Sequence, residues 1–147
     1  MGSKYQQQNL FNFGKENKVI TKPIRLIELF AGIGSQYKAL SLLTDKVESW
    51  KICEWAIPSI KAYNSIHIKD FTDYSVGKTK EEMLARINGV SANYNEPISY
   101  HKLEKMPLCK IQDIYNNCVA TRNLVNIMNV KGKDLELVDT DKYEYIY

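Results

Sequence analysis

Two glycines one residue apart, Gly32 and Gly34, are the first residues of this chain whose spacing could do chemistry, and they follow the apolar run 24–30. Glycine lets the backbone turn sharply and approach a ligand closely, and the amides that open a following helix favour polar or anionic groups. The dinucleotide fingerprint needs a third glycine where this sequence has Tyr37. The bulk of a tyrosine opposes close packing of helix on strand. The turn therefore disfavours a pyrophosphate.

An acidic and an aromatic side chain stand together further along the chain. Glu54 comes 20 residues after Gly34, and an acid at the end of a second strand can accept hydrogen bonds from two ribose hydroxyls. Trp55 follows directly and offers a flat face to an adenine ring. Together these residues predict a site for an adenosine whose tail carries no phosphate, and S-adenosylmethionine is such a ligand. An NAD-dependent oxidoreductase is the alternative, and it rests on Gly32, Gly34 and Glu54 alone.

The elements that must position these residues alternate between strand and helix. Short apolar or alternating runs predict strands over 24–30 and 47–53. Helical spacing of apolar residues predicts helices over 35–43, with Ser35 as its cap, and over 55–64. This βαβα order indicates an α/β fold with a parallel sheet and right-handed crossovers.

The second half of the chain has weaker patterns. Residues 65–107 contain one predicted helix, 80–87, and are otherwise interpreted as an insertion of unknown role. An amphipathic helix is predicted over 108–123, a short strand around 135–138 and a last strand over 143–147. A strand at this last position would leave an unfinished sheet, which a partner strand could complete.

Composition bounds the class of protein. The 147 residues are 44% hydrophobic and 25% charged, which suits one compact domain and argues against disorder. Residues 1–22 are predicted to form a flexible arm, and their four lysines and one glutamate account for the whole net charge of +3. The balanced remainder lacks the clustered Lys and Arg that bind nucleic acid. No secretory signal or bilayer-spanning apolar run is visible, so we expect a cytoplasmic protein without membrane contact.

Three cysteines and two histidines complete the side chains that could do chemistry. Cys53, Cys109 and Cys118 form no Cys-x-x-Cys pair, and no paired histidines stand near them, so we expect no metal site. His67 and His101 are isolated in the sequence, and we expect structural or solvated roles for both.

Two segments of the chain carry a resemblance to a known family. Ile-Glu-Leu-Phe-Ala-Gly-Ile-Gly at 27–34, followed by Cys-Glu-Trp at 53–55, resembles the first two motifs of the DNA cytosine-5 methyltransferases. The resemblance implies a Rossmann-like S-adenosylmethionine-dependent methyltransferase fold with a partial parallel sheet and helices on both faces. It makes residues 23–147 a partial cofactor-binding domain. It also implies that the cofactor is lined by Phe30, Ala31, Gly32, Ile33 and Gly34, that Glu54 binds its ribose, and that Trp55 stacks on its adenine.

A third motif of the family, usually Gly-Asp-Ile, has its best match at Val125, Asn126 and Ile127. Here valine replaces the glycine and asparagine replaces the aspartate. Asn126 would still accept a hydrogen bond from the adenine amino group through its amide oxygen. The resemblance therefore adds Asn126 and Ile127 to the predicted cofactor site.

The same resemblance implies what this chain does not do alone. The family attacks cytosine with a cysteine in a Pro-Cys motif, uses a glutamate in a Glu-Asn-Val motif and reads DNA through a recognition domain, and none of these is in the sequence. We therefore expect no catalytic residue here, and DNA as the substrate only of a complete enzyme, which would transfer a methyl group to C5 of cytosine. A small subunit of a split methyltransferase, or a non-catalytic remnant, is the alternative. A second polypeptide would then carry the catalytic cysteine and the recognition domain.

Overall fold

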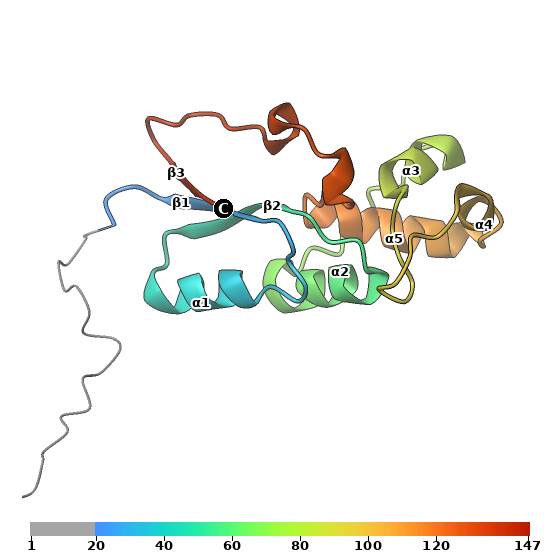
Figure 1. The fold of residues 1–147 in the computed structure, drawn as a ribbon, viewed down its shortest axis with the longest axis horizontal. Helices are drawn as coiled ribbons and strands as arrows, with labels where there is room; N and C mark the ends of the chain where they lie inside the picture. The colour runs from blue at the N-terminus through green and yellow to red at the C-terminus, as the bar shows by residue number, and fades with distance from the viewer. Residues whose placement is uncertain (1–19) are drawn as a thin grey trace, which may run out of the picture.

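A computed structural model describes residues 20–147 of the chain. Three strands in this range form one parallel sheet in the order β2-β1-β3, where β1 is Ile24–Glu28, β2 is Val47–Ile52 and β3 is Glu144–Ile146. Figure 1 shows helices beside this small sheet, which confirms the predicted α/β fold with a partial parallel sheet flanked by helices. Of the predicted flexible arm, residues 1–19 lie outside the described residues.

The central strand β1 is buried along its whole length, including its two charged residues, Arg25 and Glu28. The Arg25 guanidinium lies 3.7 Å from the ring centre of Trp50 and 3.5 Å from that of Tyr143. Its nitrogens also donate to a carboxylate oxygen of Glu48 and to the hydroxyl of Tyr145. Stacking and hydrogen bonds together offset the cost of removing this charge from water, and they join all three strands.

One side of the sheet is covered by α1, Ser35–Leu43, and α2, Ile57–Tyr63, which a short π-helix, Asn64–Ile68, continues. Both helices were predicted, and α1 has the predicted bounds, but its cap differs, and α2 begins at a later residue than predicted. Gly34 and not Ser35 occupies the N-cap position of α1, without a side-chain hydrogen bond, because the chain enters the helix through a left-handed residue. α2 begins later than predicted because the amide of Ala56 is bound by the Glu54 carboxylate outside the helix.

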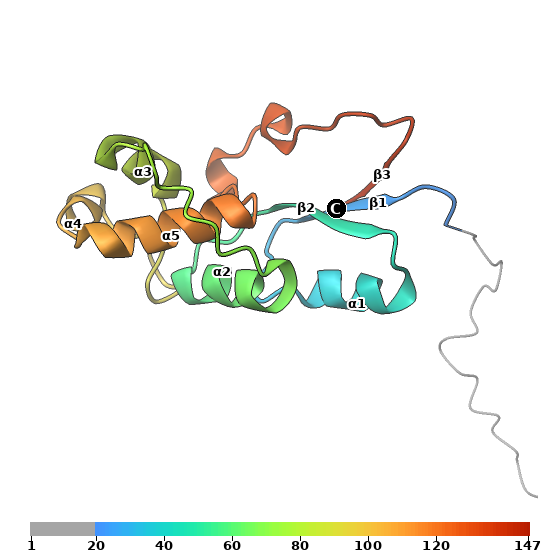
Figure 2. The same cartoon turned by 180° about the vertical axis from the view of Figure 1, so that it is seen from behind.

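The other side of the sheet is crossed by residues 127–143, as the two opposite views show (Figure 1 and Figure 2). The indole nitrogen of Trp50 donates a 2.9 Å hydrogen bond to the carbonyl of Leu135, and Lys51 pairs with Glu136 at 2.9 Å. The strand predicted around 135–138 is wrong, because a 3-10 helix ends at Leu135 and Glu136 has a left-handed φ of 50°. Contacts with β2 favour this bent backbone over an extended one.

Three further helices enclose the largest hydrophobic core. α3, Lys80–Ile87, packs against α4, Tyr100–Glu104, and α5, Leu108–Ala120. The helix predicted over 80–87 is confirmed. The sequence did not predict α4, because this helix has only 5 residues and buries a single leucine, which is too little for a periodic pattern. Residues 65–107, which the sequence led us to interpret as an insertion, supply much of this core. Its buried side chains include Met83, Leu84, Ile87, Val90, Leu103, Ile111, Ile114 and Cys118.

The helix α5 ends three residues before the predicted position, at Ala120. Arg122 takes a left-handed φ of 49°, which breaks the helix. The chain then turns along β2, where Asn123 and Ile52 form a parallel bridge. Pairing with the sheet thus stops the helix, and it brings the segment after α5 to the end of β2.

Candidate ligand-binding site

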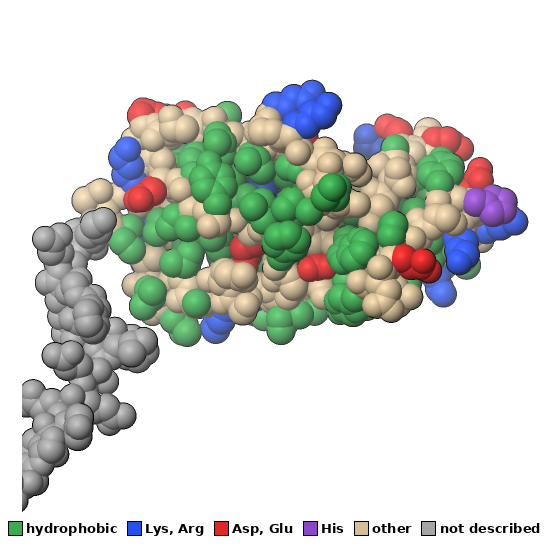
Figure 3. Space-filling model, in the orientation of Figure 1, with side chains coloured by type: hydrophobic (Ala, Val, Ile, Leu, Met, Phe, Trp, Pro, Cys, Tyr) green, Lys and Arg blue, Asp and Glu red, His purple; other side chains and the backbone are tan. Residues whose placement is uncertain are grey.

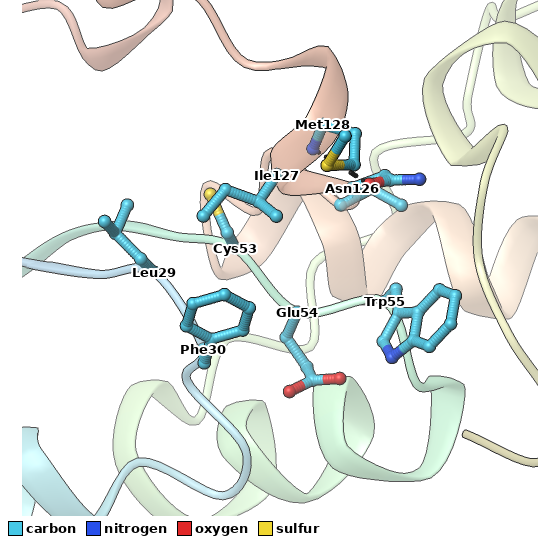
Figure 4. A pocket seen from close by; sticks show the side chains of 9 residues that line it. Leu29, Phe30, Cys53, Glu54, Trp55, Asn126, Ile127 and Met128 are labelled. Atoms are coloured by element: carbon cyan, nitrogen blue, oxygen red, sulfur yellow. Dashed lines mark hydrogen bonds between the residues drawn. The ribbon is translucent and has the colours of Figure 1, made fainter. Parts of the chain in front are cut away.

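A pocket of about 430 Å³ opens where the carboxyl ends of β1 and β2 meet the segment after α5 (Figure 4). Ligands bind at this edge of open parallel sheets, and the volume suits a small molecule. Residues from all three sequence motifs are brought together here. The lining residues are Leu29, Phe30, Cys53, Glu54, Trp55, Val125, Asn126, Ile127 and Met128.

Glu54 is buried at the centre of the pocket and is already held by the backbone. One carboxylate oxygen accepts a 2.8 Å hydrogen bond from the amide of Gly32, and the other accepts a 2.7 Å bond from the amide of Ala56. An ionised carboxylate has about four acceptor positions, so about two remain for a ligand. Figure 4 shows the carboxylate between the side chains of Phe30 and Trp55.

Two aromatic side chains flank the carboxylate at different depths. Phe30 lies at the rim and is 76% exposed, whereas Trp55 is partly buried against the core of α3 and α5. A flat ring system that enters between them could stack on either face. The pocket can therefore hold a planar heterocycle beside a group with hydroxyl donors.

The third wall is the segment Val125 to Met128, and its backbone is bent. Val125 is buried with a φ of +63°, a left-handed conformation that favours glycine and strains a β-branched residue. This geometry gives a physical reason for a glycine at the matching position of the resembled motif. The amide oxygen of Asn126 accepts a 3.0 Å hydrogen bond from the amide of Met128, which leaves one lone pair free.

Not every predicted site residue lines the pocket. Phe30, Glu54, Trp55, Asn126 and Ile127 do. The other four, Ala31, Gly32, Ile33 and Gly34, form the turn below it: the side chain of Ala31 packs inward, that of Ile33 is exposed, and Gly32 and Gly34 both have positive φ.

The glycine turn rests on His67. A Cβ atom at Gly34 would lie 2.5 Å from the His67 ring and 2.7 Å from the ring of Tyr63. The His67 ring nitrogen Nε2 donates a 2.8 Å hydrogen bond to the carbonyl of Ile33. The space below Gly34 is thus filled, and His67 has the structural role expected for it.

Sequence reasoning missed two buried polar residues that hold the site. The side-chain amide of Asn123 hydrogen-bonds both the backbone amide and the backbone carbonyl of Glu54. Glu28 accepts hydrogen bonds from the hydroxyl of Tyr63 and the amide of Tyr37, and so joins β1 to both helices below the sheet. Burial raises the pKa of Glu28, although both hydrogen bonds act in the opposite direction. A glutamate inside an apolar strand was the available signal for Glu28, and none marked Asn123.

The electrostatics of the pocket are simple. Of the described residues 20–147, Glu54 is the one charged residue that lines it, and neither Lys nor Arg does. Burial raises the pKa of the Cys53 thiol to about 11, so that this lining group is neutral near pH 7. Figure 3 shows one face of the molecule, with mainly apolar side chains over its middle and Lys and Arg mostly at its margins. The site therefore favours a neutral or cationic ligand over a phosphate.

Two kinds of feature are absent from the part of the chain that the structure describes. No helix of residues 20–147 is long and apolar enough to cross a membrane. The same residues contain no group of three or more His, Cys, Asp or Glu side chains that could hold a metal ion.

Comparison with known proteins links this chain to methyltransferases. No family model matches the chain. It is similar to the orphan methyltransferase M.SssI of Spiroplasma monobiae, with 32% identity over 139 residues, in a match that covers 88% of this chain and 35% of the relative. The chain thus spans about a third of the length of this curated relative. The similarity supports a methyltransferase family for the chain.

Proposed function

We propose that residues 23–147 form the S-adenosylmethionine-binding part of a DNA cytosine-5 methyltransferase. The observation that carries the proposal is the position of the Glu54 carboxylate, which is fixed by two backbone amides between Phe30 and Trp55 and keeps acceptor positions free. Similarity to an orphan methyltransferase supports the same family.

The lining residues suit an adenosine with a cationic tail. Glu54 accepts hydrogen bonds from the ribose hydroxyls, and its charge complements a sulfonium nearby. Trp55 and Phe30 offer aromatic faces to the adenine, and Asn126 keeps one acceptor lone pair for the adenine amino group. When bound, S-adenosylmethionine supplies an activated methyl group. Ile127 and Val125 contribute apolar side chains to the lining of the pocket.

The glycine turn contributes shape to this site. Gly32 offers its amide to Glu54, and the left-handed Gly34 turns the chain directly into α1. The turn thus fixes the side chain that binds ribose, while the rings of His67 and Tyr63 support it from below. We infer that Ala31, Gly32, Ile33 and Gly34 act as the floor of the site.

An NAD-dependent oxidoreductase is disfavoured by the charge of the pocket. A pyrophosphate needs cationic side chains or several free amides, and no Lys or Arg within the described part of the chain lines this pocket. Tyr37 occupies the position of the third fingerprint glycine, and its backbone amide is already bound by Glu28. The described residues therefore offer a pyrophosphate neither a cationic side chain in the pocket nor the amide of Tyr37.

Methyl transfer itself is not assigned to these 147 residues. None of the three cysteines follows a proline, and no Glu-Asn-Val motif occurs. In a complete enzyme the target cytosine would have to leave the DNA stack to be reached. A split enzyme, in which a second polypeptide supplies the cysteine and pairs with the edge strand β3, is the alternative arrangement.

Calorimetric titration of the chain with S-adenosylhomocysteine and, separately, with NAD tests the proposal. We expect S-adenosylhomocysteine to bind and NAD to bind at least about tenfold more weakly, because its two phosphates meet no cation among the lining residues that the structure describes. Equal or tighter binding of NAD would overturn the assignment and restore the oxidoreductase alternative.

A further inference from the structure

We propose that Asn123 is a positioning residue for the ligand-binding pocket, whose buried amide holds Glu54 and the segment Val125 to Met128 in one fixed arrangement. Asn123 does not line the pocket. It would therefore act through Glu54 and the segment Val125 to Met128 and never touch the ligand. The inference rests on the proposed function, because that function makes Glu54 a ligand-binding residue.

The side chain of Asn123 makes three hydrogen bonds to the backbone, and the residue is 0% exposed. Its amide oxygen accepts from the backbone amide of Glu54 at 3.1 Å and from that of Val125 at 2.8 Å. Its amide nitrogen donates to the backbone carbonyl of Glu54 at 2.8 Å. One side chain thus joins Glu54, at the end of β2, to the segment Val125 to Met128 on the other side of the pocket.

These bonds continue the pairing of β2 beyond the end of the strand. The amide of Leu124 donates a 2.7 Å hydrogen bond to the carbonyl of Ile52, and the bridge between Ile52 and Asn123 is parallel but isolated. Past this bridge the segment bends at Val125 and leaves the sheet. The Asn123 side chain then supplies the partners that the backbone of Glu54 would otherwise find in a neighbouring strand.

Among the common side chains, asparagine fits these three bonds best. It combines an oxygen with two lone pairs and a nitrogen that donates. Aspartate keeps the acceptor but loses the donor, and it sets a negative charge against the Glu54 carbonyl. Glutamine is longer by one methylene group, which a fully packed position cannot accept without a shift.

Binding of S-adenosylhomocysteine to the Asn123→Asp variant tests the proposal, with Thr121→Val as the matched control. Thr121 is buried at the same end of α5 and donates a 2.7 Å hydrogen bond to the Asn117 carbonyl, but it does not line the pocket. Both substitutions should lower the urea midpoint of unfolding. We expect only Asn123→Asp to weaken calorimetric affinity, by at least about tenfold.

Two further measurements separate positioning from a general loss of structure. The Asn123→Ser variant is neutral and keeps one acceptor, so it should lose less affinity than Asn123→Asp. It replaces Asn123→Asp in the binding test if the aspartate variant does not fold. In a Glu54→Ala background Asn123→Asp should cost less affinity than in the wild type, because the part of its effect that acts through the Glu54 side chain is already lost. Wild-type affinity in a folded Asn123→Asp chain, or an equal loss in Thr121→Val, overturns this inference alone. Absence of binding by the wild type overturns the proposed function as well.

Discussion

The Glu54 carboxylate accepts a 2.8 Å hydrogen bond from the amide of Gly32, so the end of β2 is tied directly to the turn that follows β1. Its second oxygen holds the Ala56 amide and thereby the start of α2. The residue proposed to bind ribose is therefore fixed before a ligand arrives. A site arranged in this way lowers the ordering cost of binding.

The two glycines of the turn should differ sharply in their tolerance of alanine. At Gly34 a new Cβ would meet the rings of His67 and Tyr63 within 2.7 Å, and φ is +85°. We expect Gly34→Ala to lower the free energy of unfolding by at least about 3 kcal/mol, from strain and overpacking together. Gly32→Ala meets no atom within 4 Å at φ +52° and should cost about 1–2 kcal/mol. Urea denaturation of both variants measures this difference, and equal losses would contradict the packing below Gly34.

The cysteines should differ in reactivity in the folded chain. Burial raises the pKa of the Cys53 thiol to about 11, whereas Cys109 is exposed. Because the thiolate is the reactive form, an acid with a raised pKa stays protonated and inert until higher pH. We expect a disulfide reagent at pH 8 to label Cys109 rapidly, and Cys53 only on unfolding or as the pH approaches 11. Peptide mass spectrometry locates the label, and fast labelling of Cys53 at pH 8 would argue against a closed pocket wall.

The buried guanidinium of Arg25 should matter far more than the exposed one of Arg122. Both lie over the ring of Trp50 and both pair with Glu48, but the Arg25 side chain is 10% exposed and that of Arg122 is 46% exposed. Lysine cannot reproduce the planar contact between Trp50 and Tyr143. We expect Arg25→Lys to cost about 2 kcal/mol of unfolding free energy and Arg122→Lys less than about 1 kcal/mol. Chemical denaturation measures the unfolding free energy of both variants. A larger loss for Arg122→Lys than for Arg25→Lys would contradict the described packing.

Much of the site was predictable because its signals are local. The apolar run before Gly32, the glycine spacing and the pair Glu54 and Trp55 each lie within a short stretch of the sequence. Strand, turn and helix propensities agree over this stretch, and the structure has these elements close to their predicted bounds. The sequence therefore predicted that Phe30, Glu54 and Trp55 lie together at one end of the sheet, where they line the pocket.

The remaining features depend on contacts between residues distant in the sequence. Asn123 takes its role from Glu54, 69 positions earlier, and nothing near it in the chain indicates that role. The bend at Glu136 arises from bonds to Trp50 and Lys51, which override the strand propensity of the apolar residues around it. The core role of residues 65–107 appears only when α3 meets α5.

Calorimetric titration of S-adenosylhomocysteine into the wild-type chain and its Glu54→Ala variant tests the central claim most directly. Two charge-assisted hydrogen bonds from ribose hydroxyls are each worth on the order of 1.5–3 kcal/mol, so we predict that the wild type binds and that Glu54→Ala loses at least about tenfold in affinity. Glu54→Gln, which keeps one acceptor, should show a smaller loss, and Glu81→Ala, an exposed carboxylate outside the pocket, none. Circular dichroism checks that each variant is folded. Unchanged affinity in a folded Glu54→Ala chain would contradict the account.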